Sequence, residues 1–254
     1  MWLFVWDSEP SKIFVGDTQI SKVFLWDTQV RPSGWTPWAN TMGYYTFDDQ
    51  NASQITDTSW NNRNLTWWTM PSYTLVSGSN YAWVFSNVSS SNIAPSYSYW
   101  PMNWDYTILC WVKPTTNTAS YVNIFYGWTT GNEHQISLIR GYNSRQFEYF
   151  DYTDAGHITK RTTIKTWASL NTWYLVGYTR NWTSVKTYYD WVNTNSITGN
   201  SSSYNKTFYL WSANVWLSRL PWQIWECIIE NKVRTAQEIA DYYNQTKASY
   251  LWFN

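Results

Sequence analysis

The sequence predicts an all-β protein, an antiparallel β-sandwich with one short C-terminal helix. Short segments rich in β-branched and aromatic residues recur along its 254 residues, and many alternate apolar with polar side chains, as half-buried strands do. Clusters of Asn, Asp, Ser, Thr and Gly separate these segments at spacings typical of a sandwich. A chain of this length can bury a sizeable core, in one large all-β domain or in two small ones.

Residues 1–32 contain a short repeat. The segment from Ile13 to Ile20 is followed ten residues later by a close copy from Val23 to Val30, and residues 3–8 form a third copy. Each copy places two turn residues after three apolar ones, which predicts tight β-hairpins. The predicted turns are at 6–7, 16–17 and 26–27. A unit this small cannot bury its own face and needs neighbours or a partner.

One position of the repeat carries residues of opposite size. The first turn residue is Trp6, Gly16 or Trp26 in the three copies. The favoured two-residue turn gives this residue a positive φ, where glycine is unstrained and a residue with a bulky Cβ is strained. Tryptophan at this position is therefore inconsistent with the turn conformation that the rest of the repeat predicts.

Residues 33–41 form a predicted linker, in which Pro37 blocks regular strand pairing. The main predicted domain covers residues 42–247, and residues 248–254 form a tail. Its predicted strands are 44–48, 81–88, 106–114, 121–127, 134–139, 146–152, 173–179, 185–190, 206–211 and 223–230.

The helix is predicted from a capping box. Thr235 and Glu238 have the spacing at which each side chain accepts a hydrogen bond from the backbone amide of the other. Ile239, Tyr242 and Tyr243 follow at helical spacing and give one apolar stripe that can lie against a sheet. We expect the helix to start at Thr235 and to pack on the edge of the sandwich.

Composition narrows the function classes. The formal net charge is +0 with 13% charged residues, so no basic field recruits nucleic acid. No apolar run approaches the roughly 18 residues of a transmembrane helix. The start "MWLFVWDSEP" lacks the basic region of a signal peptide. We expect an extracellular, cell-surface or virion-surface protein, exported by a signal outside this chain or carried within a virus particle.

The order of four motifs resembles a known family. They are "YYTFDD" followed by "ITDTSWNN", "DYTILCWVKP", "TWYLVGYTRNWTSVKTYYDWV" and "LPWQIWECIIENKVRTAQEIADYY". Together they are similar to the LamG-like jellyroll domains of the concanavalin A-like lectin and glucanase superfamily, over about residues 43–246. The resemblance implies an antiparallel jellyroll over residues 42–247 and a lectin-like role.

The chain departs from that family at several tryptophans. It has 22 Trp and only 10 Gly, below the usual glycine share of about 7%. The tryptophans that stand where the family has glycine, or where a turn or strand entry asks for it, are Trp6, Trp26, Trp60, Trp104, Trp182, Trp191, Trp222 and Trp225, with Trp38, Trp67, Trp83 and Trp211 as weaker candidates. We hypothesise that the gene reads UGA as glycine and was translated with UGA as tryptophan. The alternative is that these residues are real and serve sugar stacking or adhesion.

Trp111 and Trp173 are interpreted differently, because the family also has tryptophan there. Both lie in apolar segments away from turn residues. We expect both rings to be largely buried between the two sheets, with an acceptor for each indole N–H.

Catalytic chemistry is not expected, and no catalytic residue is assigned. A glucanase needs paired carboxylates on one strand face, two residues apart. Glu148 and Asp151 are three apart, on opposite faces of a strand, and Asp154 completes the acidic stretch. Glycoside hydrolysis therefore remains a distant alternative. His134 and His157 have no partner at zinc-ligand spacing, whereas calcium near Asp151 and Asp154 stays open.

Glycan recognition is the leading prediction, as the lectin resemblance implies. Sugars bind aromatic faces together with polar side chains that bond their hydroxyls. The strand from Arg145 to Tyr152 and its loops offer candidate ligand-binding residues: Tyr142, Asn143, Tyr149, Tyr152 and Asp154. The alternative is a structural protein, such as a virion appendage or adhesin, that assembles with itself or with a protein partner through residues 1–32.

The chain contains two cysteines. Cys110 and Cys227 both lie in strand-like apolar runs, "YTILCWV" and "ECIIE". They allow either one disulfide or two buried free thiols that act as small hydrophobes.

Overall fold

A computed structural model describes most of the chain. The described residues are 13–15, 18–20, 23–25, 28–30, 40–46, 54–66, 72–77, 80–84, 94–95, 100–101, 105–115, 122–129, 132–141, 144–153, 158–199, 205–212 and 222–247. The chain divides into two compact units, residues 1–39 and residues 40–254.

The first unit contains two antiparallel β-hairpins in its described part. The strands are β1 (Ile13–Val15), β2 (Thr18–Ile20), β3 (Val23–Leu25) and β4 (Thr28–Val30). In the register, Ile13 pairs with Ile20 and Val23 pairs with Val30, so residues 16–17 and 26–27 connect the strands. The copy at residues 3–8 lies outside the described residues.

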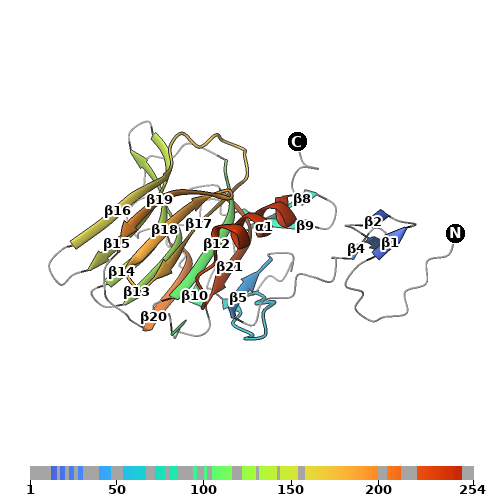
Figure 1. The fold of residues 1–254 in the computed structure, drawn as a ribbon, viewed down its shortest axis with the longest axis horizontal. Coiled ribbons are helices and arrows are strands. Elements are labelled where there is room, and N and C mark those ends of the chain that lie inside the picture. The colour runs from blue at the N-terminus through green and yellow to red at the C-terminus, as the bar shows by residue number, and fades with distance from the viewer. Residues whose placement is uncertain are drawn as a thin grey trace. The chain divides into compact units, whose positions relative to one another are not determined.

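The second unit is an antiparallel β-sandwich (Figure 1). One sheet has eight strands in the order β19-β18-β17-β12-β21-β9-β8, with β5 also paired to β21. Its strands are β5 (Thr41–Tyr45), β8 (Ser72–Ser77), β9 (Asn80–Val84), β12 (Asp105–Pro114), β17 (Tyr174–Asn181), β18 (Ser184–Tyr189), β19 (Val192–Thr198) and β21 (Trp222–Glu230).

The second sheet has six strands in the order β11-β20-β13-β14-β15-β16. These are β11 (Trp100–Pro101), β13 (Val122–Thr129), β14 (Asn132–Gly141), β15 (Ser144–Thr153), β16 (Ile158–Lys165) and β20 (Asn205–Ser212), and a small third sheet joins β6 (Gln54–Ile55), β7 (Leu65–Thr66) and β10 (Ala94–Pro95). Every ladder among the described strands is antiparallel. The predicted all-β sandwich is confirmed.

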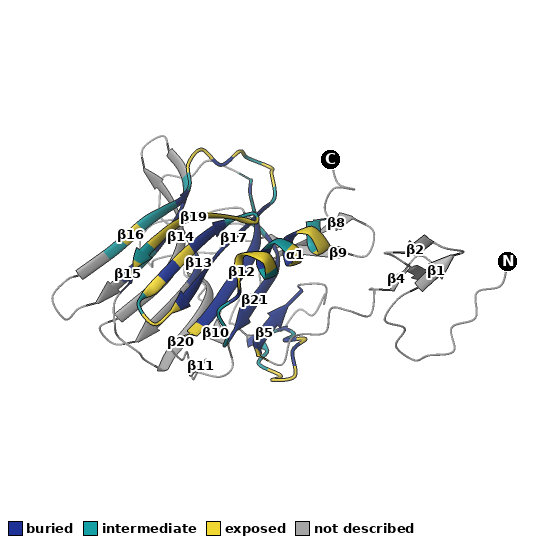
Figure 2. Ribbon diagram, in the orientation of Figure 1, coloured by how far each residue is buried: buried dark blue, intermediate teal, exposed yellow. Residues whose placement is uncertain are grey.

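The core fills the space between the two large sheets. Aromatic rings meet across it: Tyr149 of β15 lies 4.8 Å from Tyr178 of β17, and Phe147 lies 5.7 Å from Tyr174, measured between ring centroids. These edge-on contacts are favourable geometries for aromatic pairs. Figure 2 shows the buried residues running along β12, β17 and β21, whose long apolar runs predicted them.

The C-terminal helix α1 (Ala236–Lys247) begins at the predicted capping box. The Glu238 amide donates to the Thr235 hydroxyl at 3.2 Å, and the Thr235 amide donates to the Glu238 carboxylate at 2.8 Å. Its apolar stripe contacts the outer face of the eight-stranded sheet, where the Tyr242 hydroxyl donates to Glu226 Oε1 at 2.9 Å. The predicted packing on the sandwich edge is wrong, because β12 and β21 are central strands. Within the described part of the chain, no helix has the length and apolarity to cross a membrane.

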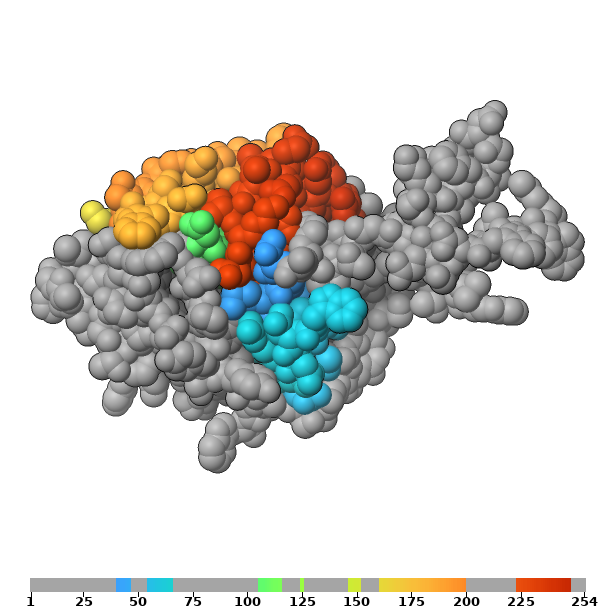
Figure 3. Space-filling model, turned by 60° about the horizontal axis from the view of Figure 1, so that its bottom comes forward, coloured from blue at the N-terminus to red at the C-terminus, as the bar shows by residue number. Residues whose placement is uncertain are grey.

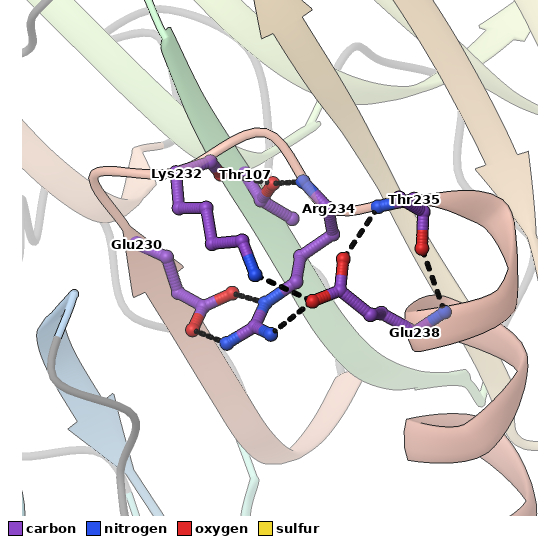
Figure 4. A network of polar contacts seen from close by, with 6 residues as sticks. All are labelled: Thr107, Glu230, Lys232, Arg234, Thr235 and Glu238. Carbon is purple, nitrogen blue, oxygen red and sulfur yellow. Dashed lines mark hydrogen bonds and ion pairs between the residues drawn. The ribbon is translucent and has the colours of Figure 1, made fainter.

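A buried ion pair fixes the start of this helix (Figure 4). Arg234 donates two parallel hydrogen bonds to the Glu230 carboxylate, each 2.6 Å long, and a third to Glu238 at 2.9 Å. The Thr107 hydroxyl of β12 donates to the Lys232 carbonyl at 2.6 Å and accepts from the Arg234 amide. The end of β21 and the start of α1 are thereby tied to β12.

The "ITDTSWNN" motif forms a turn around a buried carboxylate. Asp57 Oδ1 accepts from the amides of Tyr44 and Ser59, both at 2.9 Å, and Oδ2 accepts from the Arg63 amide at 2.8 Å. Residues 54–66 accordingly lie beside residues 40–46 on the surface in Figure 3. Trp60, inside this turn, is 83% exposed.

The two tryptophans predicted to lie in the core differ from each other. Trp111 is buried and its indole N–H donates to Thr246 Oγ1 at 3.0 Å, but it lies on the outer face under α1 and not between the sheets. Trp173 is partly buried and does not belong to the core cluster, so its predicted place between the sheets is wrong. It precedes the first residue of β17, and the Lys113 ammonium lies over its ring at 5.3 Å.

Positive φ angles occur at two turn tryptophans. Trp182, the first residue of the β17–β18 turn, has φ 51°, which confirms the backbone predicted for it. Trp167, in the loop before β17, has φ 54° and was not singled out from the sequence. In the β18–β19 turn the positive φ belongs to Asp190, at 53°, and not to Trp191 as predicted.

Trp225 lies in the predicted strand 223–230. It is buried within β21, at the register shift opposite Trp111 and Val112. Outside the described side chains lie Trp6, Trp26, Trp38, Trp67, Trp83, Trp104, Trp211 and Trp222.

Candidate functional site

Strand β15 carries the predicted ligand-binding segment, and its alternation divides the segment between two faces. Phe147 and Tyr149 belong to the core between the sheets. Gln146, Glu148 and Phe150 therefore lie on the outer face of the six-stranded sheet. Two groups of charged residues result, one inside the sandwich and one outside it.

The inner group is a core ion pair. Asp151 is fully buried, and its Oδ2 accepts from Arg180 Nη1 at 3.0 Å and from the Tyr149 hydroxyl at 3.2 Å. Arg180 is itself 2% exposed and also donates to the Trp182 carbonyl at 2.8 Å. Burial and the neighbouring carboxylate raise the pKa of Tyr149 well above its usual range, so this phenol stays a neutral donor.

These contacts correct two predictions. Tyr149 cannot stack on a sugar, because its ring is enclosed between the sheets. Asp151 is not retained as a calcium ligand, since its carboxylate is buried against the Arg180 guanidinium. The described residues contain no group of three or more His, Cys, Asp or Glu that could hold a metal ion. Glu148 and Asp151 do lie on opposite faces of β15, as their spacing predicted.

Of the other predicted binding residues, Tyr142, Asn143 and Asp154 lie outside the described residues. Tyr152 belongs to β15, where it pairs with Glu133 of β14 and Thr159 of β16.

The outer group combines two neighbouring strands, and we call it the polar row: Gln146, Glu148 and Phe150 of β15 with Arg161 of β16. Arg161 pairs with Phe150 in the register. Its guanidinium donates to both oxygens of Glu148, with Nη2 2.7 Å from Oε1 and Nε on Oε2. The Gln146 side-chain amide donates to Glu148 Oε1 as well.

Exposure in the polar row is unequal. The Glu148 side chain is only 2% exposed although it lies outside the core, whereas Arg161 is 45% exposed. Three donors therefore hold a carboxylate in one orientation, and a ligand can reach the guanidinium that holds it. Phe150, partly buried on the same face, adds an apolar ring beside these polar groups.

Sequence reasoning missed Arg161, because it predicted no strand over β16. The segment "ITKRTTIK" has no clear alternation of apolar and polar residues. Arg161 is also one of many scattered charges, and only its pairing opposite β15 distinguishes it. No signal in the sequence separates it from Lys160.

No protein-family model matches this chain, and no curated protein matches it. Solved structures do match in fold. Domain 4 of AbnA, an extracellular arabinanase from Geobacillus stearothermophilus solved with arabinotriose, is 19% identical at a TM-score of 0.61 over 80% of this chain and 97% of that one. The binding domain of Paraclostridial Mosquitocidal Protein 1 is 15% identical at a TM-score of 0.63 over 82% and 52%.

The receptor-binding domain of botulinum neurotoxin type G is similar too, at 15% identity and a TM-score of 0.59, over 82% of this chain and 52% of that one. The chain thus spans about half the length of these toxin binding domains. At such low identity, the likeness shows the shared β-sandwich fold.

Proposed function

We propose that this chain is a non-catalytic recognition module that binds glycans through the polar row on the outer face of β15 and β16. The observation that carries the proposal is the Glu148 carboxylate, buried on an outward face and held by Arg161 and Gln146. Burying a charge costs desolvation free energy, so a fold rarely keeps a buried carboxylate outside its core without a use for it. Buried ionisable groups of this kind are frequent at binding sites.

The chemistry of the polar row suits a sugar. The exposed Arg161 guanidinium can donate to a sugar hydroxyl, and the Gln146 amide oxygen can accept from one, while the buried Glu148 carboxylate holds both side chains in place. Phe150 offers an apolar ring for the C–H face of a sugar. Because Glu148 already orients Arg161 and Gln146, little side-chain freedom is lost when a ligand binds.

Two comparisons support a binding role outside the cell. A domain with this fold was solved with arabinotriose, and the binding domain of botulinum neurotoxin DC, at 12% identity and a TM-score of 0.58, was solved in complex with SialylT. The opposite faces of Glu148 and Asp151 argue against a paired acid and nucleophile on β15.

A glycan array followed by calorimetry tests the proposal. We expect saturable binding by the full chain and at least about a tenfold weaker Kd for Arg161→Met, since a charge-assisted contact is lost. Lys186→Met, which removes an exposed charge from β18 in the other sheet, serves as the matched control and should bind normally. The proposal would be overturned if the chain bound no glycan on the array. It would also be overturned if Arg161→Met, with an unchanged circular dichroism spectrum, bound glycan as tightly as the wild-type chain.

Assembly is the second candidate function, and the separate unit of residues 1–39 favours it. Its described hairpins have strands of three residues, too short to bury a face alone. Light scattering over a range of concentrations tests it. Stable oligomers together with no glycan binding on the array would favour assembly, and a monomer that binds glycan would favour recognition.

A further inference from the structure

We infer that Cys110 and Cys227 form a disulfide bond that joins the two central strands β12 and β21. The two residues are direct partners in the antiparallel ladder between these strands. Both belong to the core cluster between the sheets and are 0% exposed. Their sulfur atoms lie 2.6 Å apart, closer than two thiols in ordinary contact.

The backbone geometry allows the bond without rearrangement. Directly opposed residues of antiparallel strands have Cα atoms about 4.5 or about 5.5 Å apart. Disulfides span Cα separations of about 4.4–6.8 Å, so either kind of pair fits. The ladder is regular from Thr107–Glu230 to Trp111–Glu226, and its register shift comes only after Trp111. Both side chains lie on the same inner face, so the sulfur atoms point toward each other.

The oxidation needs a two-electron acceptor, which an oxidising folding compartment supplies as a small-molecule disulfide. One cysteine thiolate attacks the oxidant and releases one thiol, and the second cysteine then displaces the other thiol from the mixed disulfide. The protein loses two protons and two electrons, the S–S bond forms, and the oxidant becomes two thiols.

The burial of the pair dictates when this exchange happens. Burial, and the Cys110 thiol beside it, raise the pKa of Cys227 well above its usual range. Cys227 therefore holds little thiolate in the folded protein, and the burial of both thiols denies access to a small-molecule disulfide. The bond must form during folding, before the second sheet covers β12 and β21. Once formed, it is shielded from reductants for the same reason.

The bond links residues 117 apart in sequence, so it restricts the unfolded chain strongly. The chain between them includes the six-stranded sheet except β11, along with β17, β18 and β19. The reduced protein should therefore melt at a lower temperature, by roughly 5–15 °C. The bond lies in the core and is independent of the glycan-binding proposal.

Refolding of the full chain tests the inference. The reduced, denatured protein is refolded with glutathione disulfide, denatured again without reductant, and treated with iodoacetamide. We expect a monomer with no alkylated cysteine and a mass lower than the dithiol by two hydrogen atoms. In a thermal melt, dithiothreitol present throughout refolding should lower the Tm.

The double variant Cys110→Ala/Cys227→Ala is the control. Its Tm should be the same after refolding with glutathione disulfide and after refolding with dithiothreitol. Two alkylated cysteines in wild-type protein that has refolded to a native circular dichroism spectrum would overturn the inference. A disulfide found only between chains would overturn it as well. The mass measurement uses wild-type protein and so does not depend on the folding of the variant.

Discussion

The indole ring of Trp111 on β12 is stacked on the phenol ring of Tyr243 on α1, with ring centroids 5.4 Å apart and planes inclined by 17°. The same indole donates its N–H to Thr246 one turn further along the helix. The helix thus packs on a central strand of the eight-stranded sheet. A second, smaller buried layer lies between helix and sheet, outside the main core.

Replacing Trp111 by alanine should remove both the stacking on Tyr243 and the hydrogen bond to Thr246. We expect the free energy of unfolding to fall by about 3–5 kcal/mol, because the helix cannot close the gap that the ring leaves. Urea denaturation measures it. Trp60→Ala is the matched control, since that ring is 83% exposed, and it should change stability by less than about 0.5 kcal/mol. Equal effects of the two substitutions would contradict the packing described here.

Replacing Trp182 by glycine should stabilise the protein. Trp182 opens a two-residue hairpin turn with φ 51°, a conformation that is strained for a bulky residue and free for glycine. Relief of that strain exceeds the extra entropy of the unfolded chain, so we expect a net gain of about 1 kcal/mol. Trp60→Gly, at a residue without positive φ, is the control and should bring no gain. A loss of stability in Trp182→Gly would refute the strain.

We propose that glycine is the native residue at 182 and at 167, because the gene reads UGA as glycine. Of the five described non-glycine residues with positive φ, three are Asn or Asp, which tolerate it, and two are these tryptophans. Peptide mass spectrometry of protein from its native source should find glycine at both positions and tryptophan at 111. Tryptophan at 182 would end the proposal.

Replacing Arg234 by methionine should destabilise the start of α1. The Glu230 carboxylate is 0% exposed and would lose its bidentate partner, which costs about 3–5 kcal/mol for a buried pair. Lys232→Met is the control, because that side chain is 40% exposed and its ion pair contributes at most about 1 kcal/mol. The double variant Glu230→Leu/Arg234→Met should recover much of the loss, and failure to recover would show that the pair does more than neutralise Glu230.

Stability should depend on pH through Asp190. Burial raises the pKa of this carboxyl to about 6, against the lowering effect of the Leu175 amide and of Lys247 and Lys165. The folded protein keeps this proton to a higher pH than the unfolded chain. The contribution of Asp190 to the free energy of unfolding therefore falls as the pH rises from about 4 to about 6.

Asp190→Asn should remove that fall and make the protein more stable than wild type at pH 7. Asparagine also tolerates the positive φ of this position and keeps an oxygen for the Leu175 amide. Denaturation series at several pH values measure the difference. Parallel profiles for the two proteins would show that Asp190 titrates normally.

Elements with local signals could be predicted from the residues alone. Strands β12 and β21 are buried on both faces and appear as continuous apolar runs, and the capping box of Thr235 and Glu238 marks the helix start within four residues. Strands β16 and β19 were missed, because edge strands rich in Thr, Asn and Lys show no apolar alternation. They form because β15 and β18 offer open edges to pair with.

Which face of each strand is covered, and by what, depends on how distant parts of the chain pack together. Alternation separates Cys110 from Trp111, but the docking of the second sheet and of α1 decides that the first lies in the core and the second under the helix. In the same way, Tyr149 is a core residue because Arg180, 31 residues away, meets it across the sandwich. The period of a strand is set by its own backbone, whereas the burial of its residues is set by partners distant in the chain.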